Sequence, residues 1–207
     1  MRMEKRREEI LNAAEQLFFT KGYNDTKVID IMNSLGIAKG GFYYYFTSKE
    51  EVLDAIILRI VEQDVERGEA ILNSPGIPVF DKLFQILLAQ RPMAGEGKDK
   101  MMMQIHQAAN AEMHQKTLVQ AILGLVPILT RVVEQGIEEG VLRTEFPKET
   151  MEFLVASGQV IFDEGWFQWE QEDIQRKICA FIRLMELALG AESGSFDYMT
   201  EILDGQI

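Results

Sequence analysis

The chain is poor in the residues that build redox, metal and nucleophilic sites. Its 207 residues include one cysteine and two histidines, which excludes an internal disulfide framework and leaves few soft ligands for a metal. The single cysteine, Cys179, suits a reducing cytoplasm. The cysteine lies on a different helical stripe from the two histidines, so these residues form no nucleophile–base set, and no phosphate-binding glycine loop occurs. We therefore predict that the protein is not an enzyme and has neither a metal site nor a cofactor.

Positive charge is also scarce, with 21 Lys and Arg against 33 Asp and Glu and a net charge of -12. A uniformly acidic protein is repelled by the phosphates of nucleic acid. The distribution, however, is uneven. Residues 1–59 hold 9 basic and 9 acidic side chains, whereas residues 60–207 hold 12 and 24. The neutral first segment can approach a polyanion, and the acidic remainder should face away from it.

Long apolar runs and strand-like alternation are absent too, so we expect no membrane segment, and the charged residues 1–9 do not form a secretory signal. Apolar residues instead recur at helical spacing, which predicts an all-α fold. Gly22 should end the first helix, and Ser48 with Glu51 forms a capping-box pattern. We place the later helices at 28–35, 38–46, 48–72, 80–88, 99–113, 118–139 with a kink at Pro127, 148–165 starting near Pro147, and 172–189, followed by a weaker segment at 193–204.

The charge division and the helix pattern together predict two domains. Residues 1–47 form a small three-helix domain, and the helix at 48–72 connects it to a larger helical bundle at 73–207. The small domain contains two short helices around the sequence Leu35-Gly36-Ile37, in which the glycine permits a backbone reversal. This helix-turn-helix pattern over residues 26–46 can place its second helix in a DNA major groove.

The second helix has an apolar underside and a polar top. Phe42 and Phe46 supply the underside, and the top carries Lys39, Tyr43, Gly40 and Tyr44 in pairs four residues apart. Lysine and tyrosine side chains bind phosphates and base edges. An alternative that the pattern leaves open is a packed aromatic cluster with the glycines in a loop.

Gly40 and Gly41 are costly inside a helix. They make sense if the backbone must lie close to another surface, such as a sugar-phosphate chain. Lys49 lies at the start of the following helix, where backbone N–H groups also favour phosphate.

The segment from Ile10 to Leu58 resembles the DNA-binding domain of the TetR family of transcription regulators. The match is ordered and correctly spaced, and it covers about the first quarter of the chain. The rest resembles the family only in its helical, acidic layout. The matching positions are Ile10, Leu11, Ala13, Ala14, Leu17, Phe18, Lys21, Gly22, Tyr23, Thr26, Val28, Asp30, Ile31, Leu35, Gly36, Ile37, Lys39, Gly40, Tyr43, Tyr45, Phe46, Ser48, Lys49 and Glu50.

The resemblance implies a regulator, most often a repressor, that binds a palindromic operator in double-stranded DNA as a homodimer and is released by a small-molecule effector. Alternatives are a transcriptional activator or a helical interaction protein without a ligand response. Ala38 departs from the serine that the family often has at this position, which puts one helix cap and phosphate contact in doubt. The resemblance implies DNA contacts from Thr26, Lys27, Lys39, Gly40, Gly41, Tyr43, Tyr44, Tyr45 and Lys49.

Family members dimerise through their last two long helices, here about 148–165 and 172–189. The second of these has a continuous apolar stripe at Ile174, Ile178, Phe181, Ile182, Met185 and Leu189. The first mixes Phe153, Leu154, Val160 and Ile161 with the small residues Ala156, Ser157 and Gly158, and small residues allow close helix approach. An ordinary core within one chain accounts for part of either stripe.

The resemblance also implies an effector site within the bundle, which should be largely apolar. Most of the candidate side chains are also ordinary core residues when taken singly. His106, Asn110 and His114 share one helix face, but no further strong ligand follows at matching spacing, so we expect these residues to supply pocket polarity or a surface face rather than to bind a metal. The candidates for the effector site are Phe84, Met102, Met103, His106, His114, Phe162 and Trp166.

Overall fold

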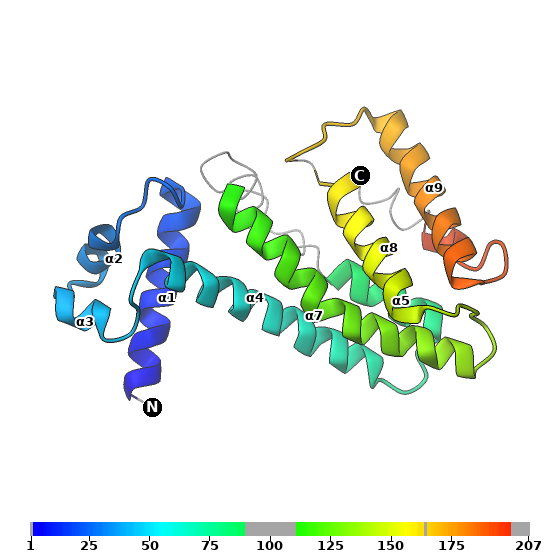
Figure 1. Cartoon of the computed structure of the whole chain (residues 1–207), viewed down its shortest axis with the longest axis horizontal. Coiled ribbons are helices and arrows are strands. Elements are labelled where there is room, and N and C mark those ends of the chain that lie inside the picture. Colours follow the sequence, from blue (N-terminus) through cyan, green and yellow to red (C-terminus); the bar gives the residue numbers. More distant parts are fainter. Residues whose placement is uncertain (1, 90–110, 164, 200–207) are drawn as a thin grey trace. The chain divides into compact units, whose positions relative to one another are not determined.

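Helices make up most of the chain in a computed structural model (Figure 1), which describes residues 2–89, 111–163 and 165–199. No strand occurs within these ranges. This confirms the all-α prediction. The helices are α1 (Arg2–Lys21), α2 (Val28–Leu35), α3 (Lys39–Tyr43), α4 (Lys49–Leu72), α5 (Val79–Ala89), α7 (Ala111–Glu138), α8 (Pro147–Ile161) and α9 (Gln171–Leu189).

Glycines in left-handed backbone conformation end the first two helices. Gly22 follows α1 with φ 93°, and Gly36 follows α2 with φ 62°, a region that costs other residues about 1–2 kcal/mol. The reversal at Gly36 lets α3 follow α2 after two further residues. α1 packs against α2, and the core of this three-helix region consists of Ile10, Leu11, Ala14, Phe18, Ile31, Met32 and Phe42, all buried.

The third helix is shorter than predicted, at 39–43 rather than 38–46. Its N-cap is Ala38, which makes no side-chain cap hydrogen bond. Phe46 nevertheless stays on the helix underside because its N–H donates to the Phe42 carbonyl at 3.1 Å. The capping box at the start of α4 is half confirmed. The Ser48 hydroxyl accepts from the Glu51 N–H at 3.0 Å, but the Glu51 carboxylate accepts from Thr47, one residue earlier than the motif requires.

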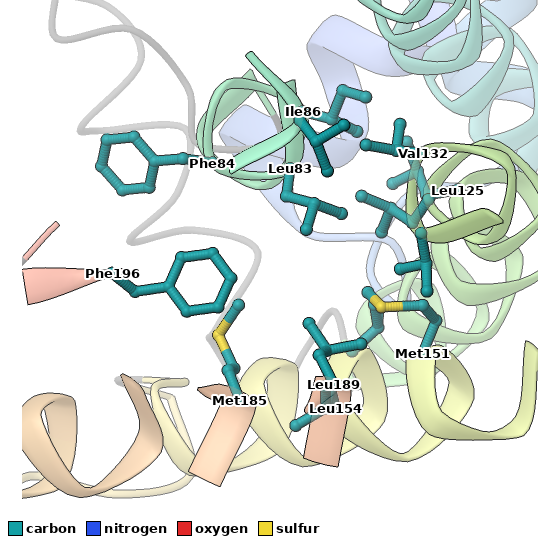
Figure 2. Close-up of a cluster of buried hydrophobic side chains, with 14 of the residues drawn as sticks. Leu83, Phe84, Ile86, Leu125, Val132, Met151, Leu154, Met185, Leu189 and Phe196 are labelled. Atoms are coloured by element: carbon teal, nitrogen blue, oxygen red, sulfur yellow. The ribbon is translucent and has the colours of Figure 1, made fainter. Parts of the chain in front are cut away.

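A second core lies among α5, α7, α8 and α9. Figure 2 shows Phe84 and Phe196 on one side of this cluster and Leu125 and Val132 on the other. The end of α4 joins the cluster through Leu72. The contributing helices are those whose apolar stripes the sequence predicts, and burial of these side chains stabilises the bundle.

The helix boundaries of α7, α8 and α9 agree with the sequence prediction in part. The predicted break between Met113 and residue 118 does not occur, because α7 runs without interruption from Ala111, and the Thr117 hydroxyl donates to the Met113 carbonyl at 2.9 Å. α7 also continues through Pro127. α8 ends at Ile161 rather than 165, where the Asp163 carboxylate accepts from the Gly165 N–H at 2.8 Å and turns the chain. Pro147 begins α8 and Gln171 begins α9, as the sequence predicts to within a residue.

The chain divides into two compact units. Unit 1 contains α1 to α3, α4 up to Glu62, and α7 up to Gln120. Unit 2 contains the rest of α4 and α7 with α5, α8 and α9. The sequence prediction joins the two domains by one connecting helix, which corresponds to α4. The two compact units divide α7 as well as α4.

α7 alone, within the described ranges, is long and apolar enough to cross a bilayer by length and composition, with a mean hydropathy of 1.5 over an 18-residue window. The prediction that no apolar segment is long enough to cross a bilayer is therefore wrong for α7 in its length and composition. Core helices of soluble proteins pass the same test, and α7 contributes Leu125, Leu129 and Val132 to the buried cluster. We interpret α7 as a core helix.

Candidate nucleic-acid interface

The short helix α3 separates buried from exposed aromatic side chains, as the sequence predicts. Phe42 and Phe46 are 0% and 1% exposed, and their ring centroids lie 6.2 Å apart. Tyr43 and Tyr44 are 45% and 70% exposed. Tyr43 packs edge-on against Phe42, and Tyr44 packs edge-on against Tyr45. The alternative of a closed aromatic cluster therefore fails for Tyr44, which presents its ring to solvent.

Among the residues that the structure describes, nothing in conformation or packing requires glycine at the two glycine positions of α3. Neither has a positive φ. A Cβ added at Gly40 meets no described atom within 4 Å, and one added at Gly41 meets the Ile37 Cβ at an ordinary 3.7 Å. Gly36 differs, because its φ of 62° requires glycine. The fold therefore explains Gly36 and leaves Gly40 and Gly41 unexplained.

Two lysines extend from this surface. Lys39 at the start of α3 is exposed, and its ammonium lies 5.8 Å from the centroid of the Tyr43 ring. Lys27 is exposed at the N-cap of α2. Its backbone N–H donates to the Asp30 carboxylate at 2.8 Å. Both ammonium groups are thus available to an anion that approaches α2 and α3.

A salt bridge holds the start of α2 against the end of α1. The Lys21 ammonium contacts the Asp30 carboxylate at 2.6 Å. The hydrogen bond from Lys21 and the one from the Lys27 backbone lower the pKa of Asp30. These contacts fix the orientation of α2, from which the turn at Gly36 and then α3 follow.

Two residues expected to contact DNA use their side chains inside the unit. Thr26 is 1% exposed, and its hydroxyl donates to the Gly22 carbonyl at 2.7 Å. The Lys49 ammonium donates to the Tyr23 carbonyl at 2.6 Å and lies 4.1 Å from the Tyr23 ring centroid. Burial lowers the pKa of Lys49 and raises the pKa of Tyr23. In this conformation both side chains support the turn before α2.

A surface hollow of about 440 Å³ lies beside α3, and the sequence patterns do not reveal it. Gly40 and Gly41 contribute backbone to it, and Arg6 reaches it from α1, more than thirty residues earlier in the chain. The Tyr44 hydroxyl also contacts α1, donating to the Met3 Sδ at 3.3 Å. No motif spans this separation, so only the fold brings these groups together. The hollow is lined by Arg6, Ile37, Ala38, Gly40, Gly41, Tyr44 and Tyr45.

The residues predicted for an effector site do not form one described cluster. Phe84 is 7% exposed in the core of unit 2 and packs edge-on against Tyr198. Phe162 packs against Phe181, and Trp166 is 54% exposed in the turn after α8. His114 is buried but belongs to unit 1. Met102, Met103 and His106 lie outside the described residues.

The predicted dimer helices present an apolar surface, which includes most of the residues predicted on α8 but not the predicted stripe of α9. Ile178, Ile182 and Met185 are buried in the core of unit 2, as is Leu189, so that stripe of α9 is intramolecular. Gly158 likewise serves contact within the chain, because a Cβ there would lie 3.1 Å from the Phe181 ring. The exposed side carries a hollow of about 620 Å³ lined by Thr150, Phe153, Leu154, Ala156, Ser157, Val160, Ile161, Leu184 and Ala188.

Two family models match the chain. "Bacterial regulatory proteins, tetR family" covers residues 10–56, and "Tetracyclin repressor-like, C-terminal domain" covers residues 96–184. The first therefore includes α2, α3 and the start of α4.

Curated relatives and solved structures agree with these models. A fatty acid metabolism regulator protein of Bacillus subtilis is 27% identical over 175 residues, which is 80% of this chain and 84% of that protein. An uncharacterized HTH-type transcriptional regulator of Lactococcus lactis is 49% identical over 51 residues, 25% of this chain and 26% of the relative. A TetR-family regulator structure from Pectobacterium atrosepticum has a TM-score of 0.63 at 20% identity, covering 92% of this chain and 95% of that one, and shows the common fold.

These matches cover both the helix-turn-helix and the helical bundle, and the proteins they name are regulators rather than enzymes. The chain belongs to the TetR family of transcriptional regulators, with a DNA-binding helix-turn-helix at its N-terminal end.

Proposed function

We propose that the protein is a repressor that binds a palindromic operator as a homodimer and leaves it when a small molecule binds unit 2. The observation that carries the DNA-binding part is the pair Gly40 and Gly41. Each glycine costs stability in a helix, and nothing in the described residues requires either of them. Close approach of a sugar-phosphate chain to the α3 backbone gives them a reason.

We place the contact surface on α3 and the start of α2. Tyr43, Tyr44 and Tyr45 supply hydroxyls for phosphate, and Lys27 and Lys39 supply charge. Thr26 and Lys49 act through the turn that they stabilise in this conformation, and a direct contact requires that their internal hydrogen bonds break. Few side chains on this surface are suited to reading bases, so backbone positioning and DNA shape should contribute much of the recognition.

In vitro selection from a random duplex library tests this proposal, because it presupposes no operator. We expect enrichment of a palindromic sequence whose binding weakens as salt rises. Lys39→Ala and Tyr44→Ala should abolish binding while thermal unfolding stays cooperative. Arg131→Ala, which removes an exposed cation from unit 2, is the control. Failure of the wild-type dimer to enrich any duplex at low salt would contradict the proposal.

The hollow between α8 and α9 supports the homodimer. Phe153 is 74% exposed and Leu184 is 50% exposed, and large apolar side chains gathered on one face typically mark an interface. One helix-turn-helix reads a single half-site, whereas a two-fold pair reads both halves of a palindrome. We therefore propose that the exposed side of α8 and α9 meets the same side of a second copy.

We propose a largely apolar effector that binds within unit 2, because most of the buried side chains of that unit are apolar. Phe84, at the edge of this interior, is our first candidate for contact. The Bacillus subtilis relative is named as a regulator of fatty acid metabolism, which is consistent with an apolar compound. Native mass spectrometry of the purified protein should reveal a co-purifying compound, and adding that compound should release the selected duplex. We also propose a cytoplasmic location, because a regulator of this kind acts on DNA.

A further inference from the structure

We infer that Arg6 of α1 is a phosphate-binding residue of the DNA interface and that Glu9 holds it until DNA arrives. The inference rests on the proposed DNA binding and adds a contact outside the helix-turn-helix segment. Its starting point is the hollow beside α3, in which Arg6 stands next to the two glycines that the fold does not explain.

The shape of the hollow suits one strand of a duplex backbone. Because glycine has no side chain, the backbone atoms of Gly40 and Gly41 form part of its surface directly. Tyr44 and Tyr45 also line it. A glycine surface admits a bulky group such as a deoxyribose at van der Waals distance, and tyrosine hydroxyls donate to phosphate oxygens. An anion seated there needs a cation, and Arg6 is the charged residue in the lining.

In the DNA-free protein, Arg6 makes a contact with Glu9 that a DNA phosphate can replace. Its guanidinium donates to the Glu9 carboxylate at 2.6 Å. The two side chains are 46% and 38% exposed, so water screens the pair and its contribution to stability is small. A phosphate can replace the carboxylate, and its oxygens can accept two parallel hydrogen bonds from a guanidinium. Glu9 therefore keeps the guanidinium near the hollow and competes with DNA for it.

Unit 2 contains a matched control. Arg67 pairs with Asp64 three residues away, as Arg6 pairs with Glu9, and its side chain is also about half exposed, while Asp64 at 14% is more buried than Glu9 at 38%. This pair does not line the hollow. Arg67→Gln and Asp64→Asn therefore make the same charge changes as Arg6→Gln and Glu9→Gln without altering the proposed site.

The experiment measures the affinity of a fluorescent duplex, selected with the wild-type protein, as a function of salt. For Arg6→Gln we expect weaker binding and a salt slope shallower by about 0.9 for each lost phosphate contact, or about 1.8 for a dimer. Glu9→Gln should tighten binding severalfold, and this gain should disappear in the Arg6→Gln background. Both control variants should keep the wild-type slope, and thermal unfolding should be unchanged throughout.

Two results would overturn the inference while leaving the proposed function intact. One is a wild-type salt slope in Arg6→Gln. The other is an equal gain from Glu9→Gln with and without Arg6, which would show only a general effect of removing a negative charge. Failure of the wild-type protein to select any duplex would instead contradict the proposed function itself.

Discussion

Replacing Gly40 and Gly41 together by alanine should change protein stability and DNA affinity in opposite directions. Both glycines are in α3 with ordinary helical backbone, and the added Cβ atoms find open space or a normal contact at 3.7 Å. Alanine is favoured over glycine in helices by about 0.5–1 kcal/mol, less in a short first turn. We expect the double variant to raise the free energy of unfolding by about 1 kcal/mol, which corresponds to about 2–4 °C in a chain of this size.

The same two methyl groups should weaken DNA binding at least tenfold, which is about 1.4 kcal/mol. They stand on the surface that we expect to lie against the sugar-phosphate chain, and a close contact cannot accommodate them without separation of the two surfaces. Fluorescence anisotropy with the selected duplex measures the affinity, and thermal and chemical denaturation followed by circular dichroism measure the stability.

Gly36→Ala is the control for both readings. Its φ of 62° makes alanine strained although space is open, so we expect a loss of about 1 kcal/mol in unfolding free energy. A Gly40/Gly41 variant that is more stable but binds DNA with wild-type affinity would refute the reasoning. So would a variant that is destabilised like Gly36→Ala, since the glycines would then serve the fold.

Three further predictions concern the rest of the molecule. Phe153→Glu should convert the proposed dimer to monomers in light scattering, while Phe146→Glu, which is also largely exposed (62% against 74%) but lies outside the α8–α9 hollow, should not. Burial by itself would raise the pKa of Glu186, but hydrogen bonds from Arg183 and from the Phe196 and Gly194 N–H groups outweigh it and the pKa is lowered. Its stabilising effect is therefore full above about pH 4.5 and is lost as the pH falls through the lowered pKa. Glu186→Gln should flatten that acid-side decline in urea titrations, whereas Glu172→Gln on the exposed side of α9 should not. Arg59→Gln should lower the unfolding free energy by about 2 kcal/mol, because the guanidinium binds Glu8, Asn12 and Glu15 of α1; a loss no larger than that of the exposed Arg67→Gln would contradict this.

The sequence predicts the elements of unit 1 well because their signals are local. Helical spacing, a left-handed glycine and an alternation of buried and exposed aromatics each act within a few residues, so Gly36 ends α2 and Phe42 is buried as expected. The predicted break in the helix before Leu118 is wrong, since α7 is continuous there. No glycine or proline interrupts the chain there, and the packing of α7 extends the helix.

Contacts between distant segments escape such patterns. An apolar stripe on α9 shows that one side is buried, but it does not say whether the neighbour is α8 or a second copy. In the structure that stripe belongs to the core of the chain itself, whereas the exposed Leu184 of α9 lines a hollow together with the exposed Phe153 of α8. Thr26 similarly matches a family contact position, yet its hydroxyl is bonded to Gly22. Arg6 reaches α3 only through the packing of α1.

The use of cations in unit 1 connects these proposals. Lys21, Lys49 and Arg59 all form hydrogen bonds within the unit, so they stabilise the fold more than they attract DNA. Lys5, Arg7, Lys27 and Lys39 are exposed, and Arg6 is held by one carboxylate that water already screens. With this limited number of outward cations, a single copy of unit 1 should neutralise few phosphates, and its binding alone should be weak at moderate salt. In the homodimer that we propose, the two copies of unit 1 add their binding free energies through effective concentration. An effector of the proposed kind, by altering the spacing of these two copies, then has only to remove one contribution to release the DNA.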